Sequence, residues 1–476
     1  MAGTFIIGET KIRPGTYFNI QKVGGNQLAG ADDGTTAVFF KADFGPLNEV
    51  VEIAPGDGYE KVFGTAGTTD AIREVLAAGV KKALCCRVGK GGTVANTKLK
   101  TAGDVPPAKD ALSITAKHPG TKAFSIEVRE KLSDTSLKEC IIYAGTKEFE
   151  KFEFAAGEEE DEVKNLAAAF VNSQNFACEI LDSATGVLAE TEITAFTPGT
   201  DPTVSTEDYS TAFSAAEAYR FNTACVDTEE TAVHLLLASF IDRIFNAGQL
   251  GLAIVAEKNT VSLDDRMDHA AGFNSEKMHY VVNASVEESG EKVEGYLVAA
   301  RIAGLIAACP SNKSLTHSVI SGFTKLVDVL TPTQITNAEK KGCIVLSTNT
   351  TGQIWIDSAI NTLVTPSDNQ DDGWKKIRRT KTRYELITRC NDQADSLIGK
   401  VDNDTNGRAT VVSQLQGIVN AMVNEGKLVS GTVTENTLYT SDGDYAYFDI
   451  SVIDKDSIEH IYLTYKSVSY THLRAH

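Results

Sequence analysis

Residues 353–364 read QIWIDSAINTLV, and residues 373–429 read GWKKIRRTKTRYELITRCNDQADSLIGKVDNDTNGRATVVSQLQGIVNAMVNEGKLV. From Tyr384 onward, apolar residues recur at spacings of three and four, which is the pattern of an amphipathic helix. The pattern returns from Ala409, and Gly399 stands where the first helix would have to end. The stretch therefore predicts two packed helices beside a small sheet.

The loop between these two helices partly matches a calcium-binding loop. Its residues at positions 1, 3, 5 and 6 of such a loop are Asp402, Asp404, Asn406 and Gly407. Position 12, which needs a bidentate Glu, is Ser413. We therefore expect a turn built from Asp, Asn and Gly rather than a calcium site.

Length and charge limit the classes of function. The chain has 476 residues, enough for two to four domains. Its 45 basic and 64 acidic residues give a net charge of -19, which opposes binding to nucleic acid because phosphates would be repelled. We expect no nucleic-acid partner.

The cysteines and the apolar segments indicate a protein made and kept in the cytosol. None of the eight cysteines forms a CxxC pair, so buried free thiols are expected. The N-terminal residues lack the apolar core of a signal peptide. The apolar run Tyr296–Cys309 is too short to span a bilayer and contains Arg301, so direct membrane insertion is not expected.

The order of elements predicts an α/β fold with an insertion. Helices such as Glu229–Asn246 alternate with strands such as Leu252–Ala256, which is typical of a central mixed sheet with helices on both faces. Short alternating strands fill the middle of the chain and predict a β-rich inserted domain. The C-terminal part is expected to be an α+β domain with extended terminal arms. The expected units are an N-terminal arm at 1–20, a central domain at 21–88 and 205–347, an inserted domain at 89–204, a C-terminal domain at 348–465, and a non-native tail at 466–476.

The motifs of enzymes are incomplete. Gly89–Gly92 lacks the spacing of a phosphate-binding loop, so a flexible domain junction is expected there. No HExxH or GxSxG motif is present. Asp265 and His269 are four residues apart on a predicted helix, but Ser262 and the nearby aspartates also fit an ordinary helix start. We expect no catalytic residue, cofactor or metal.

Several segments, in order, resemble contractile tail sheath proteins, the outer sleeve of contractile phage tails and phage-tail-like bacteriocins. RPGTYFNI at 13–20 and FGPLNEVVEI at 44–53 are similar to the first segments of the family. The C-terminal resemblance lies in an INTL turn, a basic strand leading into a helix, an IGKV-type helix exit and an NxxGR-like loop, at Ile360–Leu363, Trp374–Arg389, Ile398–Val401 and Asn403–Arg408.

The resemblance implies a structural subunit that polymerises into a helical sleeve around a tail tube and contracts to drive the tube through a cell envelope. Its implied partners are further copies of itself, the tail tube protein, and baseplate and tail terminator proteins. It would be assembled in the cytoplasm of a bacterial host and belong to a virion or a phage-tail-like particle. The alternative is a soluble α/β hydrolase or nucleotide-binding enzyme.

Two sets of residues are the expected assembly sites. The terminal arms would add strands to an adjacent subunit, with Tyr17, Ile20, Ile461 and Leu463 as inward anchors of strands at Thr16–Ile20 and Ile458–Tyr465. The family's C-terminal domain lines the inside of the sleeve, so the basic run would face the tube through Lys375, Lys376, Arg378 and Arg379. The other interpretation of this run is a solvated strand edge.

Overall fold

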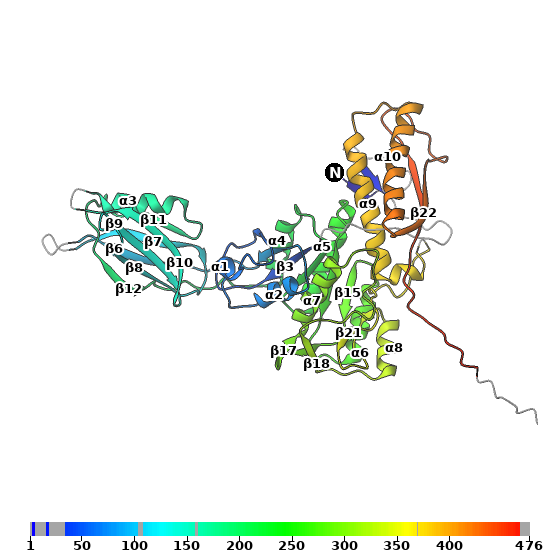
Figure 1. Ribbon diagram of the computed structural model, residues 1–476, viewed down its shortest axis with the longest axis horizontal. Coiled ribbons are helices and arrows are strands. Elements are labelled where there is room, and N and C mark those ends of the chain that lie inside the picture. Colours follow the sequence, from blue (N-terminus) through cyan, green and yellow to red (C-terminus); the bar gives the residue numbers. More distant parts are fainter. Residues whose placement is uncertain are drawn as a thin grey trace, which may run out of the picture.

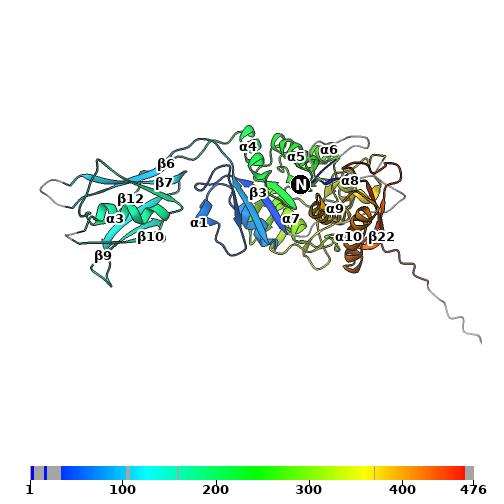
Figure 2. The same ribbon diagram turned by 90° about the horizontal axis from the view of Figure 1, so that it is seen from above.

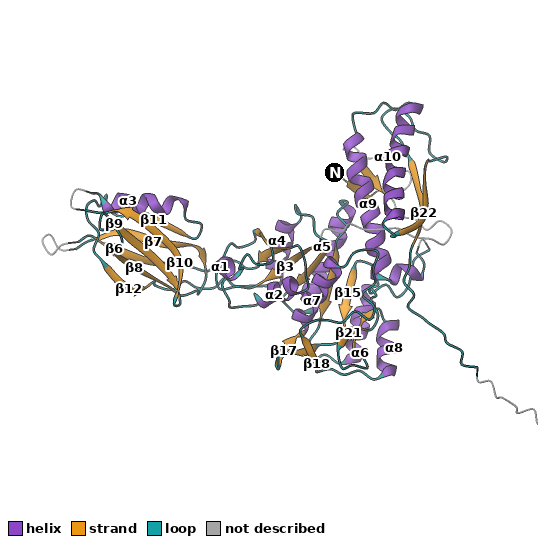
Figure 3. Cartoon of the chain, viewed as in Figure 1, coloured by secondary structure: helices purple, strands orange, loops and turns teal. Residues whose placement is uncertain are grey.

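The computed structural model describes residues 2–4, 16–18, 34–102, 108–157, 160–368 and 370–466. These residues form an elongated molecule, with the inserted residues at one end, an α/β body in the middle and a helical pair at the other end (Figures 1 and 2). Strands dominate the inserted end and helices the C-terminal end, while the middle mixes both (Figure 3).

The central body is built on a seven-stranded sheet in the order β19-β15-β14-β13-β3-β5-β4. All neighbours run parallel except the edge strand β4, which is antiparallel to β5. Every residue of β3 is buried, as expected of a strand covered on both faces. The strands are β3 (Thr35–Phe40), β4 (Val50–Ile53), β5 (Lys82–Arg87), β13 (Thr223–Val226), β14 (Leu252–Ala256), β15 (Met278–Val281) and β19 (Cys343–Ile344).

Helices cover both faces of this sheet, so the predicted fold class is confirmed. In β3, Val38 and Phe40 contribute to one core, while Phe39 contributes to the other, because side chains alternate along a strand. The first core lies under α2 (Asp70–Ala77), which follows the single turn α1 (Glu60–Phe63), and under α7 (Gly295–Ala308). The second lies under α4 (Thr206–Ala216), α5 (Thr231–Asn246), α6 (Leu263–Phe273) and α8 (Pro332–Lys340).

Two small sheets complete the first core. Val286, Phe323 and Ile354 come from these sheets and are buried with α7. The β16–β17 hairpin was not predicted from the sequence. The strands are β16 (Ser285–Glu288), β17 (Glu291–Glu294) and β18 (Phe323–Leu326) in one sheet, and β20 (Leu346–Thr348) and β21 (Ile354–Ile356) in the other.

The inserted residues form two sheets around one core, in the orders β10-β9-β8-β12 and β11-β7-β6. Phe124 and Ile142 enter this core from the first sheet, and Leu112 and Phe176 from the second. Apolar residues of α3 (Glu162–Ala169) and η1 (Phe170–Asn172) pack against it. The strands are β6 (Val94–Lys100), β7 (Asp110–Pro119), β8 (Phe124–Glu130), β9 (Leu137–Ala144), β10 (Lys147–Ala155), β11 (Phe176–Ile180) and β12 (Thr191–Ala195).

The junction between the inserted and central bodies is a hydrogen-bonded ladder, which corrects the expectation of a flexible connection at Gly89–Gly92. Lys90 and Thr203 exchange two main-chain hydrogen bonds of 2.9 and 3.1 Å. Thr93 and Thr200 exchange two more, of 3.2 and 3.0 Å. The glycines allow the entering and leaving chains to approach closely, and the ladder then fixes them.

The C-terminal body contains the predicted helical pair. Residues of α9 (Ile377–Leu397) and α10 (Thr405–Asn424) share a core with β22 (Leu428–Glu435) and β23 (Phe448–Asp454). Gly399 follows α9 with a φ of +73°, as expected of a glycine that ends a helix. Within the described residues, β22 and β23 pair only with each other.

The basic run lies in a helix, so its expected start as a strand is wrong. The short helix η2 (Asp372–Lys375) leads directly into α9. Ile377 and Tyr384 of α9 pack in the first core of the central body, whereas Leu386 packs in the C-terminal core. One helix therefore belongs to both bodies, and the predicted boundary after residue 347 falls inside β20.

Candidate functional site

The segment after β23 carries large apolar side chains into solvent. Residues 455–466 form no helix or strand and leave the body of the molecule (Figure 1). A contiguous exposed apolar segment of this kind marks an interaction site, whereas scattered exposed apolar residues are ordinary. The exposed fractions are 84% for Ile458, 74% for Ile461, 92% for Tyr462, 90% for Leu463 and 90% for Tyr465.

The expected arm strands are only partly visible in a single chain. The strand predicted at 458–465 is absent, because an extended segment needs a neighbouring main chain to pair with. Of the expected anchors, Ile461 and Leu463 are exposed, Tyr17 lies in β2 (Thr16–Phe18), and Ile20 lies outside the described residues.

The described parts of the N-terminal segment lie on their own chain. β1 (Ala2–Thr4) pairs in parallel with β2. β1 lies beside α5, and β2 lies beside α9. In the single chain these two strands are therefore folded back, which differs from the expectation of an arm that leaves its subunit. Pairing with each other gives their main chains partners that a free arm would lack.

The four expected tube-facing residues all contact polar groups of their own chain. Each basic side chain meets an acidic or hydroxyl group of η2, of the end of β23 or of the segment that follows. The contacts are Lys375–Asp372 at 3.0 Å, Lys376–Asp456 at 2.7 Å, Arg378 to the Ser457 hydroxyl at 2.6 Å, and Arg379–Asp454 at 2.9 Å. The interpretation as a solvated strand edge is wrong, because the run is helical and Arg378 is only 8% exposed.

The next basic residues of α9 join it to the central body. The Arg383 guanidinium lies 3.2 Å from the ring centroid of Trp374 and 2.9 Å from the carboxylate of Glu276. The Lys381 ammonium donates to the main-chain carbonyls of Ile306 and Cys309 at the end of α7. A cation there is favourable because the last carbonyls of a helix have no partner within the helix.

The crevice that would hold a ligand in an α/β enzyme is filled by the protein itself. In such sheets ligands bind where successive connections leave on opposite faces, here at the carboxyl ends of β3 and β13. Asp227 follows β13, is 2% exposed, and accepts from the Tyr209 hydroxyl at 2.5 Å and the Lys41 main chain at 2.9 Å. The Thr68 hydroxyl donates to the same carboxylate. Burial raises the pKa of Tyr209, so this donor stays protonated.

The candidate metal residues on α6 are used elsewhere. Ser262 caps the helix by accepting from the Asp265 main chain at 3.1 Å, which confirms the helix-start interpretation. His269 instead contacts Glu257, just after β14, with 2.9 Å between Nδ1 and the carboxylate. Asp268 pairs with Lys341 at 2.7 Å. In the described part of the chain, no three His, Cys, Asp or Glu side chains come together as metal ligands would.

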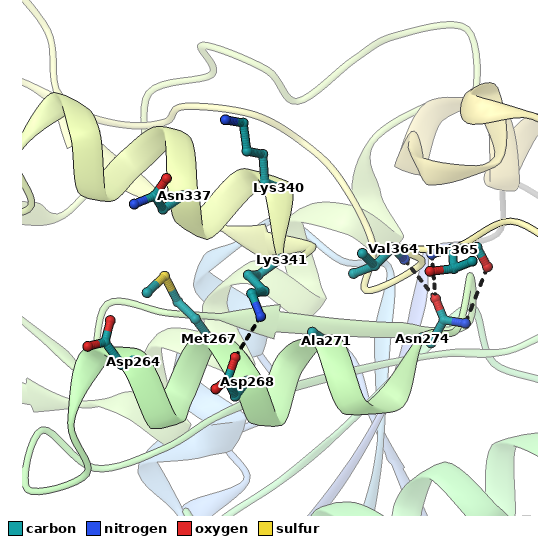
Figure 4. Close-up of a pocket in the computed structure, with 10 residues that line it drawn as sticks. All are labelled: Asp264, Met267, Asp268, Ala271, Asn274, Asn337, Lys340, Lys341, Val364 and Thr365. Atoms are coloured by element: carbon teal, nitrogen blue, oxygen red, sulfur yellow. Dashed lines mark hydrogen bonds and ion pairs between the residues drawn. The ribbon is translucent and has the colours of Figure 1, made fainter.

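An open groove of about 720 Å³ lies between α6 and α8 (Figure 4). The Asp268–Lys341 ion pair crosses it, and the Asn274 amide oxygen accepts from the main chains of Val364 and Thr365 at 2.9 and 2.8 Å. The Asp268–Lys341 pair and the Asn274 amide oxygen thus have their partners within the chain.

The calcium-like loop is a helix start. Asp404 caps α10 and accepts from the main chain of Gly407 at 2.7 Å. Asn406 already lies in the helix. Three of the four matching positions, Asp404, Asn406 and Gly407, therefore serve the helix.

The cysteines agree with the expectation of free thiols. All eight cysteines are free. Burial raises the pKa of Cys343 and of Cys390 to about 12, so these thiols are unreactive. Among the helices described, none combines the length and the apolar character that crossing a bilayer requires.

Residues 203–362 match the family model of the phage tail sheath protein central domain. The chain carries a tail sheath central domain. The matched residues include α4, the strands from β13 to β21 and the helices between them. The resemblance to contractile tail sheath proteins that the sequence suggested is thereby confirmed.

Two relatives match most of the chain. The uncharacterized protein YqbK of Bacillus subtilis is 22% identical over 408 residues, covering 83% of this chain and 82% of that protein. The phage-like element PBSX protein XkdK of the same organism is 23% identical over 403 residues, covering 82% and 80%.

Solved sheath structures share the fold. The sheath tail protein of Desulfitobacterium hafniense superimposes with a TM-score of 0.67 at 18% identity, covering 93% of this chain and 100% of that one. The sheath tail protein of Listeria innocua gives 0.68 at 20% identity, covering 91% and 97%. The helical sheath of the anti-feeding prophage, in its contracted state, gives 0.56 at 10% identity, covering 97% and 100%.

The buried polar residues at the strand ends were not singled out from the sequence. Asp227, Glu257 and Asn283 each follow a buried apolar strand at its carboxyl end. Asn283 accepts from the Leu346 main chain at 2.6 Å, just as Asp227 and Glu257 collect nearby donors. A polar residue directly after an apolar run was the signal that could have identified them.

Proposed function

We propose that this sheath subunit polymerises into a helical sleeve around a tail tube and shortens that sleeve to drive the tube through a cell envelope. Such a sleeve would be assembled in the cytoplasm of a bacterial host and would form part of a phage tail or a phage-tail-like particle. The observation that carries the proposal is the exposed apolar segment 458–465, in a chain whose two-stranded sheet β22–β23 pairs with no other strand among the described residues.

The segment 458–465 and the β22–β23 sheet could pair with each other, but within one chain they point in different directions. β22 and β23 pair only with each other among the described residues, so the outer edge of β23 has no strand partner, whereas the Gln416 side chain already bonds the main chains of Gly431 and Val433 in β22. The segment 458–465 is extended and apolar, as a strand added to such an edge would be. It leaves in the direction away from β22 (Figure 1). Pairing with a second copy of the chain would satisfy both.

Such pairing would contribute free energy to holding a polymer together. Fully burying one Leu, Ile or similar side chain contributes about 1.5–3 kcal/mol. Each main-chain hydrogen bond adds about 0.5–1.5 kcal/mol net. Ile461 and Leu463 together with a few hydrogen bonds would therefore hold adjacent subunits, while the chain between them could still bend during contraction.

The test replaces the two expected anchors. The variant Ile461→Asp/Leu463→Asp should fold and melt like the wild type, because both side chains are in solvent in the single chain. Electron micrographs should show loss of sleeves. His460→Asp/Tyr462→Asp is the matched control, since these residues would face the other side of the strand. Sleeves that form normally from the first variant would contradict the proposal.

We also propose that the basic run contacts the tail tube, but only after it releases its contacts within the chain. Lys376, Arg378 and Arg379 would have to leave Asp456, Ser457 and Asp454 to reach acidic groups on a tube. The double variant Lys376→Glu/Arg378→Glu tests this role. If sheath and tube still assemble together, with the same dependence on salt, these residues are not the attachment. Baseplate and terminator proteins are proposed as further partners.

We also propose that the subunit has no catalytic activity and needs no metal or nucleotide. This is supported by the crevice filled by Asp227 and by the capping roles of Ser262 and Asp404. Titration calorimetry with calcium, zinc or a nucleotide should give no stoichiometric heat. Binding of any of them at one equivalent would overturn this part of the proposal.

A further inference from the structure

Residues 454–459, here called the arm root, are attached to the start of α9. Asp454 accepts from Arg379 at 2.9 Å, and Asp456 lies 2.7 Å from Lys376. Arg378 donates to the Ser457 hydroxyl at 2.6 Å. The basic run thus contacts the arm root at three successive points.

The far end of the arm root is attached to the central body. The carboxylate of Glu459 lies 3.2 Å from the Lys376 ammonium. It also accepts from the hydroxyls of Ser314 and Thr316, at 3.1 and 3.3 Å. The Thr316 hydroxyl receives a hydrogen bond of 3.1 Å from the main chain of Ala359. The arm root therefore bridges β23, α9 and a loop of the central body.

The attachment ends abruptly. All residues from 460 to 466 are exposed, and none has a hydrogen bond to the rest of the described chain. By contrast, only 1% of the Asp454 side chain and 13% of the Glu459 side chain are exposed. The contacts are thus partly buried and form a network, unlike isolated surface ion pairs, which contribute little.

We propose that Lys376, Arg378 and Arg379 are positioning residues that clamp the arm root and so fix where the C-terminal arm leaves the subunit. The proposal rests on the proposed function of the arm. In this proposal the basic run binds the subunit's own arm. His460 is then the first residue of the arm that is not held by the clamp. Because Glu459 also holds Ser314 and Thr316, a neighbour bound by the arm is linked to the central body as well as to β23.

The clamp can be opened without unfolding α9. Lys376 occupies the N-cap position of α9 without a side-chain cap hydrogen bond, and a negative charge at a helix start is favourable. Lys376→Glu would place a carboxylate against Asp456 and Glu459. Lys376→Glu/Asp456→Lys exchanges the charges and should close the clamp again. Lys375→Glu is the matched control, since Lys375 contacts Asp372 and not the arm root.

The readout is brief proteinase K cleavage of the full-length subunit, with the cut positions found by mass spectrometry. Cleavage follows the population of the open form. Within residues 454–466, the wild type and Lys375→Glu should be cut mainly beyond residue 459 and only slowly within 455–459. Lys376→Glu should also be cut within 455–459, about tenfold faster than the wild type, which corresponds to about 1.4 kcal/mol. The exchanged variant and Lys376→Arg should resemble the wild type.

Three outcomes decide the proposal. Equal cleavage of the wild type and Lys376→Glu within 455–459 would overturn it. So would an exchanged variant that is cut as fast as Lys376→Glu. If cleavage changes as expected but Lys376→Glu still builds normal sleeves in electron micrographs, the clamp stands and the proposed role of the arm in assembly fails.

Discussion

The ring of Phe44, in the loop after β3, packs edge-on against the ring of Phe124 in the inserted domain, with centroids 5.2 Å apart. Phe44 is fully buried, and the Lys122 ammonium lies 5.3 Å from its ring centroid. A side chain of the central body thus fills the core of the inserted domain. Together with the main-chain ladder, this contact joins the two bodies into one unit.

Removing the Phe44 ring should loosen this unit. We expect Phe44→Ala to lower the free energy of unfolding by about 3–5 kcal/mol, because it leaves a cavity in a fully packed core. Thermal denaturation measures the loss. Val171→Ala is the control within the inserted domain, since Val171 is 76% exposed, and it should change little. An equal effect of the two changes would show that Phe44 does not contribute as a core residue.

The close approach of the two bodies also depends on Gly120. Its φ is +154°, and a Cβ there would lie 1.8 Å from the main-chain oxygen of Asp43. We expect Gly120→Ala to push the bodies apart and to speed proteolysis within residues 89–93. Gly145→Ala is the matched control, because Gly145 also has a positive φ, +62°, but open space around it. Unchanged proteolysis of Gly120→Ala would contradict the tight junction.

The sequence predicted the elements whose stability is local and missed the contacts made between distant segments. The strand Leu252–Ala256 was predicted with the bounds that the structure gives, because it is a continuous apolar run. The contacts of the basic run were not predicted, since the partners of Lys376 and Arg379 lie about eighty residues later in the chain. A pattern of charges does not say which acidic residues will meet it.

The junction between the central and inserted bodies was also mispredicted, because it depends on contacts between distant segments. Glycines at 89–92 indicated a flexible connection, because glycine permits many backbone conformations. Their actual role depends on Pro202 and Thr200, which lie close enough to contact a Cβ placed on Gly89 or Gly92. That proximity follows from the inserted domain as a whole and is invisible in a short motif.

The carboxyl pair Glu339 and Asp357 predicts a dependence on pH. Burial, and then the neighbouring Asp357 carboxylate, raise the pKa of Glu339 from 4.5 to about 7. The folded state therefore holds a proton that the unfolded state releases above pH 4.5. This contribution to stability is complete below pH 4.5 and is lost as the pH rises through about 7.

A neutral side chain at this position should remove that loss. We expect Glu339→Gln to melt at a higher temperature than the wild type at pH 8, and at about the same temperature at pH 4. Glu291→Gln, an exposed change in β17, is the control and should show no such difference. Identical shifts at both pH values would mean that Glu339 does not carry an extra proton in the folded state.

At Glu425 we expect the opposite dependence on pH, with stability lost in acid. Hydrogen bonds from Arg389, which lies 2.7 Å away, and from Lys427 lower the pKa of Glu425 to about 2. Its contribution to stability is therefore present above pH 4.5 and is lost as the pH falls toward 2. Glu425→Gln should be less stable than the wild type at pH 7 and should approach it near pH 2. Denaturation with urea across this range measures both, and a gap that stays constant would refute the assignment.

The last prediction concerns the N-terminal segment. A deletion of residues 1–20 should abolish sleeves in electron micrographs, because the arm strand Thr16–Ile20 would no longer reach an adjacent subunit. The core residues given above belong to elements from β3 onward, so we expect the melting of the subunit to change little.

In the single chain β2 lies beside α9, so a deletion could also affect the fold of the subunit. Tyr17→Asp is the finer variant, since it keeps the segment but places a charge at the expected anchor. If the deletion unfolds the subunit, the segment is part of the fold rather than a link between subunits. If both variants still form contractile sleeves, adjacent subunits are held without this strand.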